Sequence, residues 1–424
     1  MSVLKKHSLN IVKFFYLFIT GCILLSSIQS YHRSVIIISL FILNILWILK
    51  WNKRDQLNKE YIFFYIIVTL SSILLTRPIW ESDYARYFID GMHSAKGGPV
   101  YKIKPSKSSY KKEFPQAWKE SQYNNFGSIY PGLSVYFFKL IVNISDENYP
   151  RFIYIFKIFA LIIGLTIALL ISKFKHNRFA YQTVTLAMLH PLLILEWYIN
   201  LHFDFLFAFV ILLLIYSTKQ YLKIAALALG LHTKYLIFLF LPASGIKLRA
   251  LNNYIWLLSC LFITSFLYHS KADFWAMLEN IFIFGLDWEM NAGTFKLSQI
   301  ILSALHINKN IIKISLLIQI LLFAIFFVIH FKKHGLSKDN FWRLVLFFII
   351  TSPIVNPWYF TWILPLILVS SDRSNYKHFI ILPIYLSYSY YFTSFFQYIF
   401  YIEHLLFFII LYFLVKSSWV CLEK

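Results

Sequence analysis

Charged side chains are scarce in this sequence. Asp, Glu, Lys and Arg make up 14% of its 424 residues, whereas a soluble domain carries about 25%. Hydrophobic residues reach 59%, and the mean hydropathy is +0.64. This balance excludes a water-soluble globular enzyme, a disordered chain and a disulfide-stapled secreted domain. The apolar runs are continuous and do not alternate with period two, which excludes a transmembrane β-barrel. The sequence therefore predicts an all-α polytopic membrane protein.

Cysteine is also rare, and several phosphate-binding and catalytic motifs are missing. Cys22, Cys260 and Cys421 lie in or beside apolar segments at no CxxC or metal-ligand spacing, so we expect small apolar fillers without a redox role. The sequence has no Walker A motif, no GxGxxG motif, no zinc-ligand spacing and no serine nucleophile elbow. We therefore expect no nucleotide-phosphate cradle, and the sequence leaves a divalent-metal requirement undetermined.

Basic residues outnumber acidic ones, with 40 Lys and Arg against 19 Asp and Glu and a net charge of +21. Most of them lie in short segments between apolar runs, which is the positive-inside pattern of membrane proteins. The excess therefore indicates orientation rather than nucleic-acid binding, and it predicts cytoplasmic N- and C-termini. Lys5, Lys6 and Lys13 precede the apolar run 14–28, and a second apolar run follows at once. This indicates a first membrane helix rather than a cleaved leader.

The apolar runs predict a bundle of about 12–14 transmembrane helices in the plasma (inner) membrane. A further segment, 222–246, is expected to be a hairpin of two short helices that meet near Thr233–Lys234. The predicted spans are 10–29, 34–50, 61–79, 152–172, 179–198, 203–218, 254–270, 310–331, 341–355, 358–371, 378–392 and 395–415.

Two long segments, 80–151 and 271–309, are expected on the external side. The first contains two amphipathic stretches, 84–92 and 131–144, which suit helices lying in the membrane interface. It is also rich in lysine between Lys96 and Lys119. Those lysines either form a solvated face or attract an anionic lipid or glycan, and the sequence favours neither interpretation.

Ionisable and polar residues gather near the expected external ends of several spans. Such residues are costly at membrane depth and are functional candidates by default. They come from segments far apart in the sequence, so a shared polar site explains them better than independent helices do. Structural explanations remain open for many of them: Asp83 or Asp204 as a helix cap, Arg86 as an ion-pair partner, His202 as a buried core histidine, Lys234 as a lysine reaching the membrane interface, and the aromatic residues as an interfacial belt. The candidates are Glu81, Asp83, Arg86, Tyr130, Asn200, His202, Asp204, Lys234, Trp288, Asn291, Asn356, Trp358 and Tyr359.

Five motifs follow one another along residues 61–370. They are Ser82 to Gly91 with Ile129-Tyr130-Pro131, His190-Pro191 through Asn200-x-His202-x-Asp204, Leu231-x-Thr233-Lys234-Tyr235, Trp288-x-x-Asn291, and Ser352-Pro353-x-x-Asn356-Pro357-Trp358-Tyr359. In this order they resemble the motifs of the GT-C superfamily of membrane glycosyltransferases. The similarity is to bacterial polyprenyl-phosphate-dependent mannosyl- and hexosyltransferases. Each motif alone is weak, whereas their order is specific.

The resemblance implies a glycosyltransferase that moves a hexose, with mannose expected, from a polyprenyl-phosphate-linked donor to a glycan or lipid acceptor. Transfer would occur with inversion on the external face, with Asp83 as general base. Ser82 stands where the family has a second acid, so Glu81 is the substitute candidate, and metal binding by the pair is in doubt. The resemblance also implies a division into two extra helices (1–60), a catalytic module (61–370) and C-terminal helices (371–424).

The remaining candidates receive roles from the same resemblance. Arg86, Lys234 and His202 are expected to bind the donor phosphate. The sugar and the acceptor are assigned to Tyr130, Asn200, Asp204, Trp288, Asn291, Asn356, Trp358 and Tyr359.

Two other classes of protein remain alternatives. A glycolipid transporter or flippase would use the same charged site, although it usually carries inverted repeats, and only one short hairpin is predicted here. An O-antigen-type polymerase or ligase would need its main external loop late in the chain, whereas the longest external segment here comes early.

Overall fold

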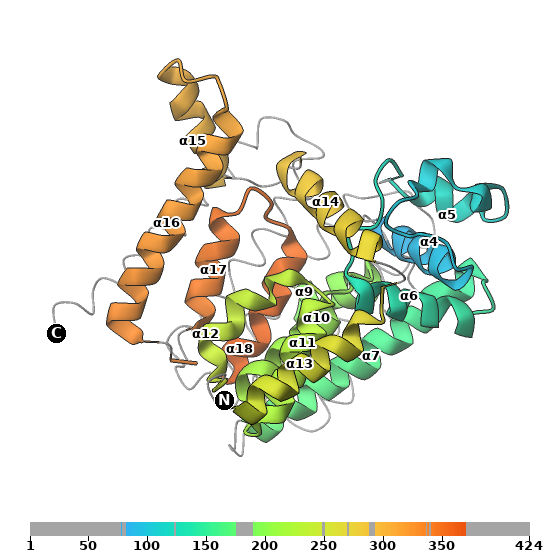
Figure 1. Cartoon of the computed structure of the whole chain (residues 1–424), viewed down its shortest axis with the longest axis horizontal. Coiled ribbons are helices and arrows are strands. Elements are labelled where there is room, and N and C mark those ends of the chain that lie inside the picture. The colour runs from blue at the N-terminus through green and yellow to red at the C-terminus, as the bar shows by residue number, and fades with distance from the viewer. Residues whose placement is uncertain are drawn as a thin grey trace, which may run out of the picture.

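A computed structural model describes residues 78, 82–122, 124–174, 190–247, 251–268, 271–287, 293–335, 337–338 and 341–369. These residues form an all-α fold without a β-strand (Figure 1). Short 3-10 helices connect several of the α-helices, and one segment is a π-helix. The 3-10 helices are η2 (Pro105–Lys107), η3 (Ser109–Lys112), η5 (Tyr235–Phe240) and η6 (Pro357–Trp362), and the π-helix is η4 (Ile194–Ile199). The α-helices are α4 (Asp83–Ala95), α5 (Pro115–Glu120), α6 (Gly132–Ile144), α7 (Tyr149–Phe174), α9 (Pro191–Leu193), α10 (Asp204–Tyr216), α11 (Gln220–Leu231), α12 (Leu241–Ser244), α13 (Leu251–Ser265), α14 (Lys271–Asp287), α15 (Gly293–Ala304), α16 (Ile311–His334), α17 (Phe341–Thr351) and α18 (Leu364–Val369).

Two helices of the described part, α7 and α16, are long and apolar enough to cross a membrane. They correspond to the predicted spans 152–172 and 310–331. Only 33% of the most apolar stretch of α7 and 11% of that of α16 is buried within the protein. Leu169 on α7 and Ile320 on α16 are 69% and 63% exposed. Large apolar surfaces of this kind mark contact with lipid or with another protein.

The other predicted spans in the described part are shorter than expected. Spans 203–218 and 254–270 appear as α10 and α13, of 13 and 15 residues. The prediction of continuous helices over 341–355 and 358–371 is wrong. Helix α17 ends at Thr351, and the chain continues through η6 and the short α18. Pro357 opens η6 and Pro365 lies in the first turn of α18, where a missing N–H is tolerated but a longer helix is interrupted.

The predicted hairpin over 222–246 is confirmed. Helix α11 ends at Leu231, and the chain turns before η5 and α12 return beside it. Gly230 permits the close approach, because a Cβ at this position would lie 2.4 Å from Cγ1 of Ile237. The predicted spans 10–29, 34–50, 61–79, 378–392 and 395–415, and residues 179–189 of another, lie outside the described residues, as do the segments 1–60 and 371–424.

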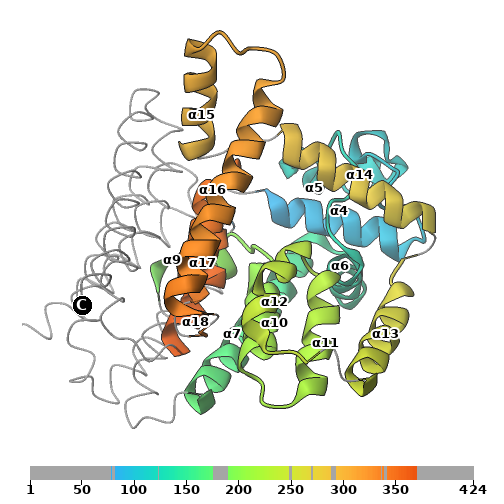
Figure 2. The ribbon, with the colours of Figure 1, turned by 60° about the vertical axis from the view of Figure 1, so that its left-hand side comes forward.

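Helix α4 lies at the centre of the first external segment and is buried from Tyr84 to Ser94. Helix α6 covers one side of it, and the segment 96–122, which we call the cap, covers another (Figures 1 and 2). A Cβ at Gly91 would lie 2.8 Å from the backbone carbonyl of Phe138, so glycine lets α4 and α6 approach closely. The two stretches that the sequence predicts to be amphipathic, 84–92 and 131–144, are helical and correspond to α4 and α6. However, α4 is enclosed by protein, and only α6 keeps an exposed apolar face, through Tyr136 and Ile144.

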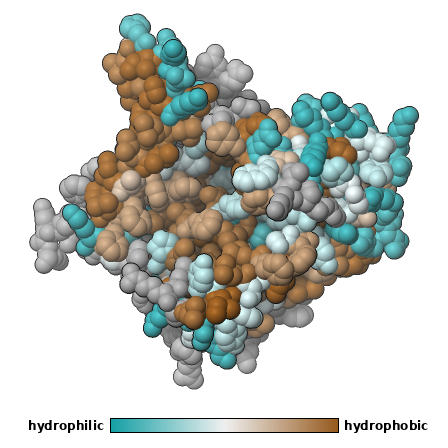
Figure 3. Space-filling view, viewed as in Figure 1, coloured by the Kyte–Doolittle hydropathy of each residue, from teal (hydrophilic) through white to brown (hydrophobic). Residues whose placement is uncertain are grey.

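Hydrophilic and hydrophobic residues separate over the visible surface. Figure 3 shows hydrophilic residues gathered over α4 and α5 and at the far end of the α15–α16 hairpin, with hydrophobic residues along α16. The two predicted external segments, 80–151 and 271–309, contain α4–α6 and α14–α15, and Figures 1 and 2 place α4, α5, α14 and α15 toward the same end of the molecule. That end carries the residues of the candidate site contributed by α4.

Candidate active site

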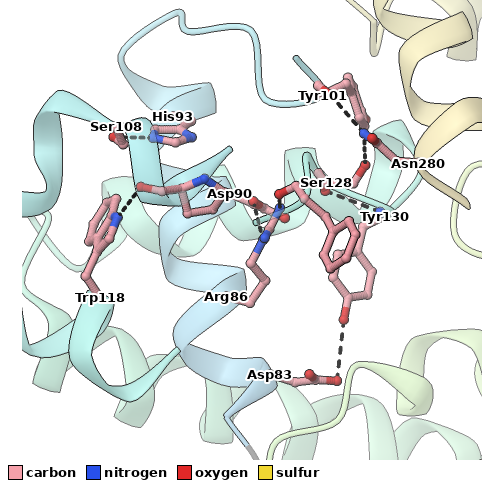
Figure 4. A network of polar contacts seen from close by, with 12 residues as sticks. Asp83, Arg86, Asp90, His93, Tyr101, Ser108, Trp118, Ser128, Tyr130 and Asn280 are labelled. Atoms are coloured by element: carbon pink, nitrogen blue, oxygen red, sulfur yellow. Dashed lines mark hydrogen bonds and ion pairs between the residues drawn. The ribbon is translucent and has the colours of Figure 1, made fainter. Parts of the chain in front are cut away.

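Asp83 is the first residue of α4, next to a dense group of aromatic rings. The Tyr130 hydroxyl donates to Oδ2 of Asp83 over 3.4 Å (Figure 4). Burial and the charge of Asp83 raise the pKa of Tyr130 well above its usual value, so the hydroxyl remains a donor. The Asp83 side chain is 15% exposed, which leaves the carboxylate accessible to a small group.

The aromatic group fixes the direction of α4. Tyr87 stacks on Phe138 with ring centroids 4.5 Å apart and meets the ring of Tyr130 edge to face at 5.2 Å. The backbone N–H of Phe203 donates to the Tyr87 hydroxyl over 3.4 Å. Burial raises the pKa of Tyr87 well above its usual value, and the charges of Asp83 and Asp204 add to the effect. The hydrogen bond from Phe203 connects α4 to the segment that precedes α10.

The second segment, from η4 to α10, has an unusual backbone. The π-helix η4 ends at Ile199, and Leu201 then adopts φ of +62°. A bulky residue rarely takes this left-handed conformation, which costs roughly 1–2 kcal/mol. Such strain, like π-helical turns, concentrates at functional sites. Here the turn directs the side chain of His202 toward Asp83 and Glu196.

His202 lies between two carboxylates and is fully buried. Its Nδ1 is 3.5 Å from Oδ2 of Asp83, and its Nε2 is 3.3 Å from Oε2 of Glu196. The ring stacks on Trp358 with centroids 3.7 Å apart and planes at 15°. The Asn200 amide donates to Oε2 of Glu196 over 3.4 Å. This arrangement orients the imidazole and places one carboxylate at each ring nitrogen.

A largely buried ion pair joins the start of α10 to the turn between α11 and η5. Nζ of Lys234, at the hairpin turn, is 2.7 Å from Oδ1 of Asp204. The Trp362 indole N–H also donates to this oxygen. The ammonium lies 5.0 Å and 5.4 Å from the ring centroids of Trp362 and Tyr359, within range of a cation–π interaction. The Asp204 side chain is 2% exposed and that of Lys234 is 18% exposed, so the cation is the accessible partner.

Arg86 is occupied within the first external segment. Its Nε is 2.8 Å from Oδ1 of Asp90, and its Nη2 donates to the Phe126 carbonyl over 3.0 Å (Figure 4). The side chains of Arg86 and Asp90 are 6% and 1% exposed. This geometry matches the ion-pair alternative noted from the sequence and ties α4 to the loop that precedes α6.

The structure brings together most of the residues that the sequence singled out. Asp83, Tyr130, Asn200, His202 and Trp358 form one connected group. Asp204, Lys234 and Tyr359 form a second group, which Trp358 joins through its edge-to-face contact with Tyr359. Asn356 is buried beside them and accepts the Tyr359 N–H at its carbonyl. Glu81, Trp288 and Asn291 lie outside the described residues.

Two further residues of the site were not assigned from the sequence. Glu196 is a fully buried carboxylate within an apolar helical turn; the cost of an acid at membrane depth places it among the polar residues at the expected external end of span 179–198, but the sequence alone assigned it no role. Trp362 follows the last motif by three residues and carries no signal of its own. Among the described residues, no group of three or more His, Cys, Asp or Glu side chains could hold a metal ion.

Comparison with known proteins identifies a family. A family model described as alpha-(1->6)-mannopyranosyltransferase, N-terminal domain (MptA_B family) matches residues 19–250. No curated protein and no solved structure shows a significant match. The matched region includes Asp83, Tyr130, His202, Asp204 and Lys234. It also begins inside segment 1–60, which the resemblance had left out, and the proposed division of the chain into three segments stays a prediction. Because the match covers more than half of its 424 residues, this chain belongs to the alpha-(1->6)-mannopyranosyltransferase family and is a mannosyltransferase of the GT-C type.

Proposed function

We propose that this enzyme transfers a mannosyl residue from a polyprenyl-phosphate donor to a glycan or glycolipid acceptor on the external face of the plasma membrane, with inversion. The observation that carries the proposal is the Asp83 carboxylate, partly exposed and held beside His202 and Tyr130. A carboxylate in this position suits removal of a proton from an attacking hydroxyl group. Family membership supports mannose as the sugar.

A polytopic bundle with cytoplasmic termini is part of the same proposal. The exposed apolar faces of α7 and α16 support membrane insertion. The hydrophilic residues over α4 and α5 support an aqueous environment at that end (Figure 3). The predicted short basic segments are assigned to the cytoplasmic side by the positive-inside rule, which supports an external position for the end that carries Asp83.

The chemical step follows from the position of Asp83. The acceptor O–H bond breaks and its proton passes to Oδ2 of Asp83, while the oxygen forms a bond to the anomeric carbon. The bond from that carbon to the donor phosphate breaks, and the phosphate departs with the electron pair. Because attack and departure occur on opposite sides of the carbon, the configuration inverts.

His202 then accepts the proton from Asp83 at Nδ1. For this transfer Nε2 carries the resting proton and donates it toward Glu196, whose charge stabilises the imidazolium that forms. Glu196 is thus a positioning residue. The carboxylates of Asp83 and Glu196 on either side of His202 would repel a phosphate, so we assign His202 to proton uptake in place of the phosphate contact expected from sequence. Its proton is released to water after the products leave.

Lys234 is the proposed partner of the departing phosphate. The ammonium has three N–H donors, one of which points to Asp204, and its partial exposure leaves donors for a phosphate oxygen. Arg86 is assigned to holding the loop at Phe126. The faces of Trp358 and Tyr359 suit a sugar ring, with Asn200, Asn356, Asp204 and Tyr130 as hydrogen-bonding groups. Glu81, Trp288 and Asn291 keep their expected roles as proposals.

Asp83→Asn tests the base directly. The change keeps the shape and removes the negative charge, so transfer from synthetic polyprenyl-phosphate [14C]mannose into membranes lacking this chain should fall by 10²–10⁴-fold. Labelling from a nucleotide-linked mannose should be absent in the wild type as well. Normal transfer by a folded Asp83→Asn protein would contradict the base assignment. Transport of an intact glycolipid without mannosyl transfer would favour a flippase.

Glu196→Gln separates the positioning role from a structural one. The amide still fills the space but cannot stabilise the imidazolium, so kcat should fall roughly 10-fold or more while KM for the donor changes little. The dependence of kcat on pH should also shift, because His202 would become a weaker proton acceptor. An unchanged pH profile in a stably folded variant would limit Glu196 to a structural role.

A further inference from the structure

The cap presents a group of exposed lysines that outnumber the acidic residues around them. Five lysines of the segment 104–119, which contains η2, η3 and most of α5, are exposed, and none forms an ion pair among the described residues. The only acidic side chains of residues 96–122 are Glu113 and Glu120. The five are Lys104, Lys107, Lys111, Lys112 and Lys119.

The acidic residues nearby offset only part of this charge. Glu147 pairs with Lys96 at 2.7 Å, and Asp273 pairs with Lys102 at 3.4 Å, so those two lysines are neutralised. Glu113 is exposed beside Lys112, and Glu120 accepts hydrogen bonds from the hydroxyl groups of Tyr84 and Tyr149 over 3.0 Å and 2.6 Å. The five other lysines outnumber these two carboxylates, which leaves a localised positive field on the cap.

The segment that carries the lysines is held in place by hydrogen bonds. The Trp118 indole N–H donates to the Pro105 carbonyl over 2.8 Å and joins α5 to η2 (Figure 4). His93, on α4, is 2.6 Å from the Ser108 hydroxyl. The Ser108 oxygen also accepts the Tyr110 N–H, which fixes the start of η3. The spacing of the charges is thereby set by the fold.

The cap is also tied to the start of α4, where Asp83 lies. The N–H of Gln122 donates to the Ser82 hydroxyl over 3.3 Å, and Glu120 contacts Tyr84. Lys119 directly precedes Glu120, and Glu120 accepts a hydrogen bond from Tyr84, the residue after Asp83. The charged surface extends from this point along α5 to η3 and η2.

The cap and the apolar surface of α6 lie on different sides of α4 (Figures 1 and 2). Tyr136, Leu140 and Ile144 give α6 an apolar exposed face, which continues toward the exposed side chains of α7. If that face contacts lipid, the cap lysines face the water beyond it. A polymer in the aqueous phase suits this position better than a lipid headgroup does.

We propose that the cap lysines bind a polyanionic glycan, which is the acceptor of the mannosyl residue. This proposal rests on the proposed function and assigns the acceptor to glycans that carry phosphate or carboxylate groups. Several phosphates or carboxylates of one chain would contact several lysines at once, so the association is multivalent and strongly dependent on salt. The end of the bound chain would then reach the Asp83 end of α4.

The test uses the full-length protein in nanodiscs of zwitterionic lipid and a fluorescent dextran sulfate as probe, with uncharged dextran as reference. A variant carrying Lys104→Gln, Lys107→Gln, Lys111→Gln and Lys112→Gln should lose at least 10-fold in affinity for dextran sulfate at 0.15 M salt. A matched variant with four other exposed lysines changed, Lys173→Gln, Lys219→Gln, Lys247→Gln and Lys338→Gln, should lose less than 2-fold. Uncharged dextran should not bind.

Equal losses in the two variants would overturn the proposal, because they would reflect net charge alone. Binding of the cap to vesicles containing anionic lipid, lost in the first variant while dextran sulfate binding persists, would also overturn it in favour of a membrane contact. Binding needs no turnover, so Asp83→Asn should bind dextran sulfate like the wild type. Failure of the base assignment would therefore leave this result unaffected.

Discussion

Replacing Lys234 by methionine should destabilise the protein strongly. The Asp204 carboxylate would stay 2% exposed, with the Trp362 N–H as a neutral partner in place of the cation. At 2.7 Å and an effective dielectric constant of about 20, the lost attraction is about 6 kcal/mol before solvation is counted. Measured costs of leaving one buried charge alone are about 3–5 kcal/mol, and this is the expected loss of stability.

The assay is thermal unfolding of detergent-purified protein, followed by the loss of monomer on size-exclusion chromatography. For a chain of 424 residues, a loss of 3–5 kcal/mol should lower the midpoint by about 3–6 °C. Lys219→Met, at an exposed position, is the control and should change stability by less than about 0.5 kcal/mol. Asp204→Asn combined with Lys234→Met should recover part of the loss, because no charge is left unpaired. A midpoint for Lys234→Met within 2 °C of the wild type would refute the reasoning.

Three further changes test other parts of the structure. Gly91→Ala should cost about 1–2 kcal/mol, since the new Cβ would lie 2.8 Å from the Phe138 backbone, whereas Gly285→Ala, in open space on α14, should be neutral or slightly stabilising in the same unfolding assay. Burial lowers the pKa of His93 from 6.5, with Arg86 adding to the effect and Asp90 opposing it. The unfolded chain therefore binds the proton more tightly than the folded chain, and stability falls as the pH drops below about 6.5. His93→Gln should reduce the difference in unfolding midpoint between pH 7.5 and pH 5. Tyr130→Phe removes the hydroxyl that donates to Asp83, so kcat should fall roughly 3–10-fold with little change in unfolding midpoint, and an unaltered kcat would show that this hydrogen bond does not matter for turnover.

The helical class and the convergence of the site could be predicted from the sequence, because both depend on the cost of burying polar groups in an apolar surrounding. The site contains Asp83, His202, Asp204 and Lys234. The first and the last of these residues are more than a hundred residues apart in the sequence, and all four lie in one connected region. The hairpin at Thr233 was predictable because a polar pair interrupts an apolar run there.

The interaction partners of the polar residues were harder to predict than the presence of those residues in the site. Arg86 had two carboxylates within helical reach, and only the fold selects Asp90 and adds the Phe126 carbonyl. The role of Glu196 depends on the left-handed turn at Leu201, which no hydropathy pattern reveals. The enclosure of α4 was also missed, because its amphipathic sequence is equally compatible with a lipid surface and with a covering cap.

The aromatic platform of the site comes from the late part of the described chain, and this has a consequence for biosynthesis. His202 stacks on Trp358, and Asp204 bonds to Trp362, which lies 158 residues further along. A ribosome adds these tryptophans long after α4 and α10 have emerged. The nascent chain should therefore remain inactive until η6 has been inserted, so that premature transfer by an unfinished polypeptide is avoided without a dedicated inhibitor.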